Sequence, residues 1–146
     1  MANDGTYSPS TPVVLDTDVW SCLFGNSKSH SLEQIQSWRE FLDGKIAVIA
    51  VQTRAEVLVG LTSLGDNRAR PIRAALESLP THPITEAVIQ SYVSLTQRSR
   101  QVGHPLHQKI HTGDRWIAAT AAALGAPLLT GDHMFRGAPG LTVVDL

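Results

Sequence analysis

The chain has 146 residues, 42% of them hydrophobic, and a formal net charge of −1 from 12 basic and 13 acidic residues. This length allows one domain with a proper core and is too short for two ordinary domains. The balanced charge argues against strong non-specific phosphate binding, which depends on clustered lysine and arginine. It leaves open a nucleic-acid enzyme in which metal ions and local basic residues supply the positive charge.

The composition also indicates where the protein acts. No apolar stretch approaches the roughly 18 residues of a membrane span, and the start of the chain lacks the features of a signal peptide. The single cysteine, Cys22, excludes an internal disulfide framework and fits a reducing compartment, where it is expected to pack in a helix. We therefore expect no membrane association and a cytoplasmic location.

The first half of the chain predicts two strands and two helices. Residues 1–12 are polar and proline-containing, so we expect a flexible tail before one domain over residues 13–146. A buried strand is predicted over residues 11–15. Apolar residues at helical spacing then predict a helix that begins at Ser31 and that Gly44 ends. A second buried strand is predicted over residues 45–51 and a helix over about 53–64.

The second half continues the alternation of strands and helices. Residues 66–79 predict a helix with Pro71 in its first turn or at a kink, and Ile84 is expected to touch the sheet edge. The remaining predicted elements are a helix over 85–102, a polar histidine-rich connection over 103–113, a helix over 114–124, and strands over 126–130 and 141–144. This alternation predicts an α/β fold: a three-layer α/β/α domain around a four- or five-stranded, mainly parallel sheet.

Four carboxylates stand just past a predicted strand or inside a helix that follows one: Asp16, Glu56, Asp114 and Asp132. The carboxyl ends of parallel strands face one crevice, so the four side chains are expected to meet there. Such a cluster repels itself at neutral pH unless it is protonated or holds a cation, and hard oxygen ligands favour Mg²⁺ or Mn²⁺. The pattern favours a metal-dependent enzyme that cleaves phosphodiesters.

Each acid also has an ordinary structural explanation. Asp16 or Asp18 could cap a following helix, and Glu56 completes a capping-box pattern with the threonine three residues before it. Asp114 could favour the positive end of a helix, and Asp132 could form a turn. Their joint placement, rather than any one residue, supports the functional interpretation.

In the segment from residue 98 to residue 115, the charged and titratable side chains are all basic except for one acid, Asp114. It is either a phosphate-contacting rim beside the acidic pocket or a solvated face, and its candidate substrate contacts are Arg98, Lys109 and Arg115. Thr130 is a further candidate, as a hydrogen-bond partner of a carboxylate or a phosphate. Three histidines between residues 104 and 111 have zinc-like spacing but no cysteine partners, so a zinc site is the weaker interpretation.

Four short motifs, in order, resemble those of the PIN-domain ribonucleases, especially the VapC-type toxins of bacterial toxin–antitoxin pairs. They are VVLDTDV (13–19), AEVLVG (55–60), GDRWIAATA (113–121) and LTGDHMF (129–135), so the resemblance covers about residues 13–146. It implies an α/β/α fold, an active site built by the same four acids, and Mg²⁺- or Mn²⁺-dependent endonucleolytic cleavage of RNA, often tRNA or rRNA. It also implies a homodimer and a small antitoxin whose C-terminal segment occupies the active-site groove.

The chain departs from the family pattern at two positions, and two other functions stay open. Met134 stands where some members carry an additional acid, which would weaken a second metal site, and Gly113 stands where a polar residue is common. The segment DTDV (16–19) also fits a haloacid-dehalogenase-like phosphatase, with Asp16 as nucleophile and Asp18 as acid and base. A PIN-like module that binds RNA or protein without cutting is the non-enzymatic alternative.

Overall fold

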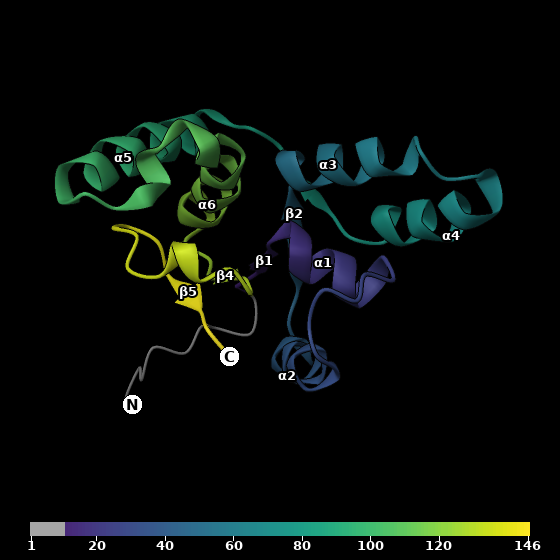
Figure 1. Cartoon of the computed structure of the whole chain (residues 1–146). Coiled ribbons are helices and arrows are strands. Elements are labelled where there is room, and N and C mark those ends of the chain that lie inside the picture. Colours follow the sequence, from purple (N-terminus) through teal and green to yellow (C-terminus); the bar gives the residue numbers. More distant parts are fainter. Residues whose placement is uncertain (1–10) are drawn as a thin grey trace.

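The centre of the molecule is a five-stranded sheet in which every pair of neighbours is parallel (Figure 1). The computed structural model describes residues 11–146, so the predicted tail, residues 1–12, lies outside the described residues except for its last two. The strands are β1 (Val13–Leu15), β2 (Ala47–Ala50), β3 (Thr81–His82), β4 (Leu128–Leu129) and β5 (Val143–Val144). Their order across the sheet is β3-β2-β1-β4-β5. The predicted parallel α/β sheet is thereby confirmed.

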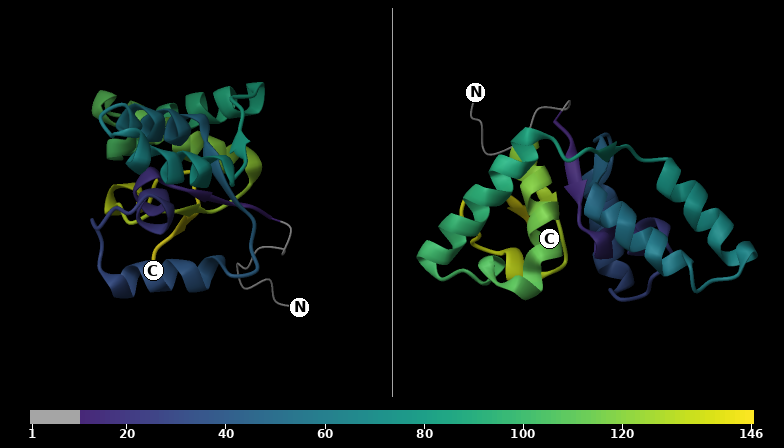
Figure 2. Two further views of the ribbon diagram at one scale, coloured as in Figure 1. Left: turned by 90° about the vertical axis from the view of Figure 1, so that its right-hand side faces the viewer. Right: turned by 90° about the horizontal axis from the view of Figure 1, so that it is seen from above.

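Helices cover both faces of the sheet, and the right-hand view of Figure 2 shows them as two separate groups. On one face lie α5 (Glu86–Val102) and α6 (Thr112–Leu124). On the other face lie α1 (Thr17–Phe24), α2 (Leu32–Leu42), α3 (Val51–Leu61) and α4 (Asp66–Glu77). The fold is therefore the predicted three-layer α/β/α arrangement. Among residues 11–146, no helix is both long and apolar enough to cross a membrane.

The alternation of side chains along β1 explains the two cores. Val14 points into the core beneath α5 and α6, while Val13 and Leu15 point into the core beneath α1 to α4. All three are at most 2% exposed, as expected for a central parallel strand with helices on both faces. The second core holds the two fully buried tryptophans, Trp20 of α1 and Trp38 of α2.

Local capping signals fix several helix ends where the sequence predicts them. The hydroxyl of Ser31 accepts a hydrogen bond from the amide of Gln34 at the start of α2. The hydroxyl of Thr85 does the same for the amide of Val88 at the start of α5. Gly125 ends α6 in the left-handed conformation, with φ 61°, which an L side chain adopts only with strain.

Three predicted details are wrong, and for Pro71 one of the two predicted alternatives is excluded. Helix α3 begins at Val51, directly after β2, so Thr53 lies buried inside the helix and cannot be its cap. Pro71 is the sixth residue of α4, not part of its first turn. The edge strand pairs residues 81 and 82 with β2, which leaves Ile84 45% exposed in the connection that follows. Finally, α6 begins at Thr112, two residues before the predicted start.

Candidate metal centre

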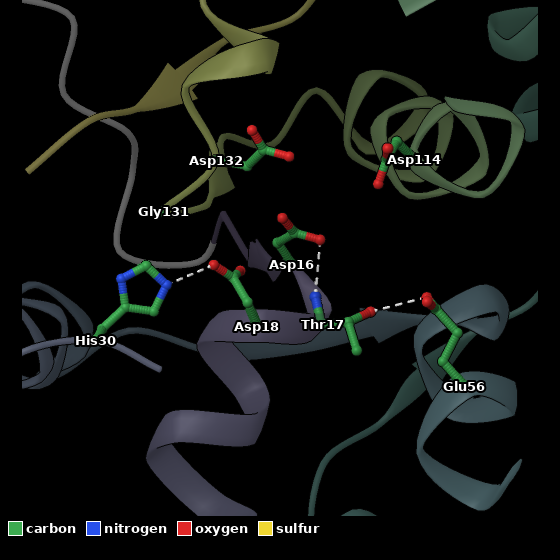
Figure 3. A pocket seen from close by; sticks show the side chains of 8 residues that line it. All are labelled: Asp16, Thr17, Asp18, His30, Glu56, Asp114, Gly131 and Asp132. Carbon is green, nitrogen blue, oxygen red and sulfur yellow. Dashed lines mark hydrogen bonds and ion pairs between the residues drawn. The ribbon is translucent and has the colours of Figure 1, made fainter. Parts of the chain in front are cut away.

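Five carboxylates line one open pocket at the carboxyl edge of the sheet (Figure 3). The pocket has a volume of about 550 Å³. Its lining residues are Asp16, Thr17, Asp18, His30, Glu56, Asp114, Gly131 and Asp132. The structure thus brings together the four acids that the sequence singles out, from segments that span more than a hundred residues. It adds a fifth acid and a histidine.

Asp16 lies at the centre of the pocket, between the end of β1 and the first turn of α1. It caps α1, because Oδ1 accepts a hydrogen bond from the amide of Thr17 at 2.8 Å. Oδ2 accepts a second one, from the hydroxyl of Thr130 at 2.7 Å. The side chain is therefore both a helix cap and part of the pocket wall, which reconciles the two interpretations of the sequence.

The environment of Asp16 opposes its negative charge. The residue is only 6% exposed, and its burial, followed by the charge of Asp18, raises its pKa from the usual 3.8 to about 7. The hydrogen bonds from Thr130 and Thr17 act in the opposite direction, and the charge of Asp114 adds to the rise. A cation in the pocket would remove this conflict, because it would stabilise the charged form.

Thr130 and Asp132 follow β4 and are joined by the same turn. The hydroxyl of Thr130, which is 4% exposed, donates to Asp16 and accepts from the amide of Asp132 at 2.9 Å. Thr130 therefore orients a carboxylate, one of the two roles that the sequence suggests. Asp132 Oδ1 accepts from the amide of Met134 at 2.9 Å and caps a short 3₁₀ turn, His133–Phe135.

Glu56 and Asp114 reach the pocket from helices on opposite faces of the sheet. Glu56 is the sixth residue of α3, and its Oε1 accepts from the hydroxyl of Thr17 at 3.0 Å. It closes no capping box, because the helix starts earlier than predicted. Asp114 lies in the first turn of α6, with Oδ2 2.9 Å from Nδ1 of His111. Both carboxylates are thus held in place by a neighbouring side chain.

His30 and Asp18 form a pair that the sequence analysis did not predict. His30 lies in the loop between α1 and α2, and its Nε2 is 2.9 Å from Oδ2 of Asp18. No short-range pattern connects the two, because they are twelve residues apart and separated by a whole helix. Only the placement of α2 against α1 brings the histidine to the pocket.

The three basic residues predicted to contact substrate do not line the pocket. For Arg115 the prediction is wrong, because its guanidinium is buried and donates to the carbonyls of Leu106 and Gln108 at 3.0 and 3.1 Å. It also donates to the hydroxyl of Tyr92 at 2.9 Å, so it ties the connection between α5 and α6 to both helices. Arg98 is exposed on α5 beside the loop that precedes β5, and Lys109 is exposed in the connection.

The histidine-rich connection forms no zinc site. His104 accepts from the amide of Leu106 through Nδ1, and its Nε2 lies 2.9 Å from the carbonyl oxygen of Arg136. In the described part of the chain, no three His, Cys, Asp or Glu side chains are close enough to enclose a metal ion. The acids of the pocket consequently surround an open space rather than form a closed cage.

The donor set nevertheless fits a hard divalent cation. All four predicted acids offer carboxylate oxygens, which suit Mg²⁺ and Mn²⁺. Mg²⁺ keeps several of its water ligands and needs few direct protein contacts, so it suits an open pocket of this size. The raised pKa of the buried Asp16 is the structural observation that most favours a cation there.

The fold and the site define an α/β/α protein with a carboxylate-lined pocket at the carboxyl edge of a parallel sheet. The PIN domain family matches residues 13–141, and the chain belongs to that family. No curated protein sequence matches the chain.

Several solved structures have similar folds. FitAcB from Neisseria gonorrhoeae has a TM-score of 0.69 and 23% identity, covering 91% of this chain and 96% of that one. VapBC2 from Rickettsia felis, bound to a DNA fragment from its promoter, has a TM-score of 0.69 and 18% identity, covering 92% and 98%. A toxin–antitoxin complex from Klebsiella pneumoniae has a TM-score of 0.65 and 24% identity, covering 90% and 95%. At these identities the likeness establishes a shared fold.

Proposed function

We propose that this PIN-domain protein is a divalent-metal-dependent endoribonuclease and the toxin of a type II toxin–antitoxin pair. The observation that carries the proposal is the convergence of Asp16, Glu56, Asp114 and Asp132 on one open pocket. Membership of the PIN domain family supports nuclease chemistry at this pocket. It also argues against the phosphatase alternative.

The residues of the pocket divide into metal ligands and groups that orient them. Asp16 and Asp114 are our first choice as direct ligands. Each has one carboxylate oxygen hydrogen-bonded to a side chain that does not line the pocket, Thr130 for Asp16 and His111 for Asp114, and these contacts orient the carboxylates. Glu56 and Asp132 bind through water or orient the attacking water. When bound, Mg²⁺ or Mn²⁺ supplies Lewis acidity, which acidifies a water molecule and offsets charge on the scissile phosphate.

The partners follow from the same proposal. The substrate is RNA, with structured tRNA or rRNA as the first candidates, and the protein acts on it in the cytoplasm as a homodimer. The similar structure from Klebsiella pneumoniae, a toxin–antitoxin complex, supports a small antitoxin as the protein partner. Light scattering of the purified protein tests the homodimer directly.

Cleavage of end-labelled total RNA by the antitoxin-free protein tests the activity. We expect discrete fragments in Mg²⁺ or Mn²⁺, and none in EDTA or with Asp16→Asn. The matched control is Asp43→Asn, which removes an exposed carboxylate at the end of α2 and should cleave normally. Cleavage that survives in Asp16→Asn would refute the assignment. Mn²⁺ binding without cleavage of any RNA would favour the non-catalytic binding module.

A further inference from the structure

The pocket contains one more carboxylate than the proposed reaction uses. Asp18 lines the pocket beside Asp16, two residues further along the chain (Figure 3). An additional carboxylate in the same pocket would offer the cation a fifth negatively charged ligand. Asp18 differs from the proposed ligands Asp16 and Asp114 in the place of its side-chain partner. Oδ2 of Asp18 lies 2.9 Å from Nε2 of His30, which itself lines the pocket, whereas the partners of Asp16 and Asp114, Thr130 and His111, do not line it. Oδ1 of Asp18 accepts from the amide of Val19 at 2.8 Å.

His30 is held in place from three sides. Its ring packs edge-on against the buried Trp38, with ring centroids 4.8 Å apart. Gly131 lies directly against the pair, because a Cβ atom there would be 2.6 Å from His30 Cε1 and 3.0 Å from Asp18 Oδ2. Figure 3 shows the pair on the wall of the pocket opposite Glu56. The loop before α2, a residue of α2 and the turn after β4 thus fix one histidine on one carboxylate.

The contact with His30 sets Asp18 apart from the other four acids of the pocket. Among the eight residues that line the pocket in the described part of the chain, His30 is the one with a basic side chain. It contacts Asp18, the one pocket acid that is not among the four proposed to hold the metal. The pairing draws Asp18 towards the loop between α1 and α2, and it leaves the other four acids facing the open space.

We propose that His30 is a positioning residue for the metal centre: it holds the Asp18 carboxylate against the pocket wall and so keeps it from binding the divalent ion directly. The inference rests on the proposed function, because it presumes a cation among the four acids. It predicts that the pocket binds the ion less tightly than it would with all five carboxylates free. Turnover benefits, since a fifth negative ligand would also repel the phosphodiester substrate.

Calorimetric titration of the RNA-free protein with Mn²⁺ tests this role. We expect His30→Ala to tighten Mn²⁺ binding on the order of tenfold, because Asp18 becomes free to reach the ion and adds a negatively charged ligand. The same substitution in an Asp18→Asn background should change nothing, since the carboxylate that His30 restrains is then absent. His30→Gln should keep the native affinity, because its amide can still donate to Asp18.

A second variant tests the pair without removing either partner. Gly131→Ala places a methyl group against both side chains and should displace His30, so we expect it to tighten Mn²⁺ binding as His30→Ala does. Far-UV circular dichroism shows whether each variant is folded. If His30→Ala cannot be obtained folded, Gly131→Ala compared in the native and Asp18→Asn backgrounds decides the question.

The possible outcomes separate this inference from the proposed function. An equal change in both backgrounds would mean that His30 acts only through its own charge, and the positioning role would be wrong. Weaker Mn²⁺ binding by His30→Ala would make His30 a ligand instead and would also overturn the role. Absence of Mn²⁺ uptake by the unmodified protein would overturn both the metal-dependent function and this inference.

Discussion

Asp16 makes the stability of the metal-free protein depend on pH. Its pKa is raised from 3.8 to about 7 in the native state, so the native state holds this proton more tightly than the unfolded chain does. The contribution of Asp16 to stability is therefore fully present below about pH 4 and is lost as the pH rises to about 7. Asp16→Asn abolishes the ionisation, so between pH 5 and pH 8 the variant should gain on the order of 2–3 kcal/mol relative to the unmodified protein. Urea unfolding at the two pH values measures the change.

The control for this prediction is an acid outside the pocket. Asp43→Asn removes an exposed carboxylate, and its difference from the unmodified protein should be the same at both pH values. A constant difference for Asp16→Asn as well would show that the buried charge has no energetic effect.

Excess Mn²⁺ should stabilise the unmodified protein more than Asp16→Asn at pH 8. An ion that binds only the native state stabilises it by about 2.7 kcal/mol when the free ion concentration is a hundred times the dissociation constant. The unmodified protein should therefore gain stability in Mn²⁺, while Asp16→Asn, which lacks a proposed direct ligand, should gain little. Thermal unfolding with Mn²⁺ or with EDTA compares the two. An equal gain by both proteins would place the ion elsewhere.

Arg115 should contribute to the stability of the fold rather than to RNA binding. Its buried guanidinium is hydrogen-bonded to two backbone carbonyls and to Tyr92, so Arg115→Ala leaves these acceptors without their donor. We expect a loss of about 2–4 kcal/mol in the free energy of unfolding. Lys109→Ala, at an exposed neighbour, should change it by less than about 0.5 kcal/mol. If urea unfolding shows similar small effects for both variants, the structural role of Arg115 is wrong.

At the scale of single elements, two glycines in open space should respond to alanine with opposite signs. Gly60 lies inside α3 and Gly125 ends α6 in the left-handed conformation, and a Cβ would meet nothing within 4 Å at either position. Gly60→Ala should stabilise by about 0.5–1 kcal/mol, because alanine favours helix. Gly125→Ala should destabilise by about 1 kcal/mol through backbone strain. The two variants control for each other in urea unfolding, and changes of the same sign would contradict the argument.

Helix ends with a local capping signal are predictable from the sequence, whereas boundaries that depend on pairing between distant segments are not. The capping hydroxyl of Thr85 and the apolar spacing that follows it fix α5 almost to the residue. The start of α3 was misplaced, because the pairing of β2 with its neighbours ends at Ala50 and the chain turns at once into the helix. The capping-box pattern at Glu56 is real in sequence but lies inside that helix.

The same distinction holds for the pocket. Asp16 and Asp132 could be placed together because each follows a strand of a parallel sheet, and topology alone brings such positions to one edge. Glu56 and Asp114 lie inside α3 and α6, so their place in the pocket depends on how these helices pack. His30 follows no strand, and only the packing of Trp38 and the absence of a side chain at Gly131 bring it there. Arg115 shows the converse: a basic residue next to a proposed ligand in sequence can point into the protein.

At the scale of the whole molecule, an apolar groove adjoins the acidic pocket. It has a volume of about 210 Å³ and lies between α1, α3 and α4. Its lining includes the apolar side chains of Trp20, Val57, Leu61, Leu64 and Ile72. Thr17 and Glu56 line both the groove and the pocket, so the two adjoin at these residues. A segment bound along the groove would therefore end beside the carboxylates.

The shared residues Thr17 and Glu56 predict how the proposed antitoxin would inhibit the proposed nuclease. An apolar antitoxin segment in the groove would reach the pocket and block access of RNA to Glu56. Leu64→Arg places a charge in the groove away from the proposed ligands, so it should weaken antitoxin binding by at least about tenfold while leaving RNA cleavage intact. Leu32→Arg, at an 85% exposed position on α2, is the matched control and should bind normally. Titrating the antitoxin against cleavage by each variant measures both effects, and full inhibition of Leu64→Arg at the native antitoxin concentration would place the antitoxin on another surface.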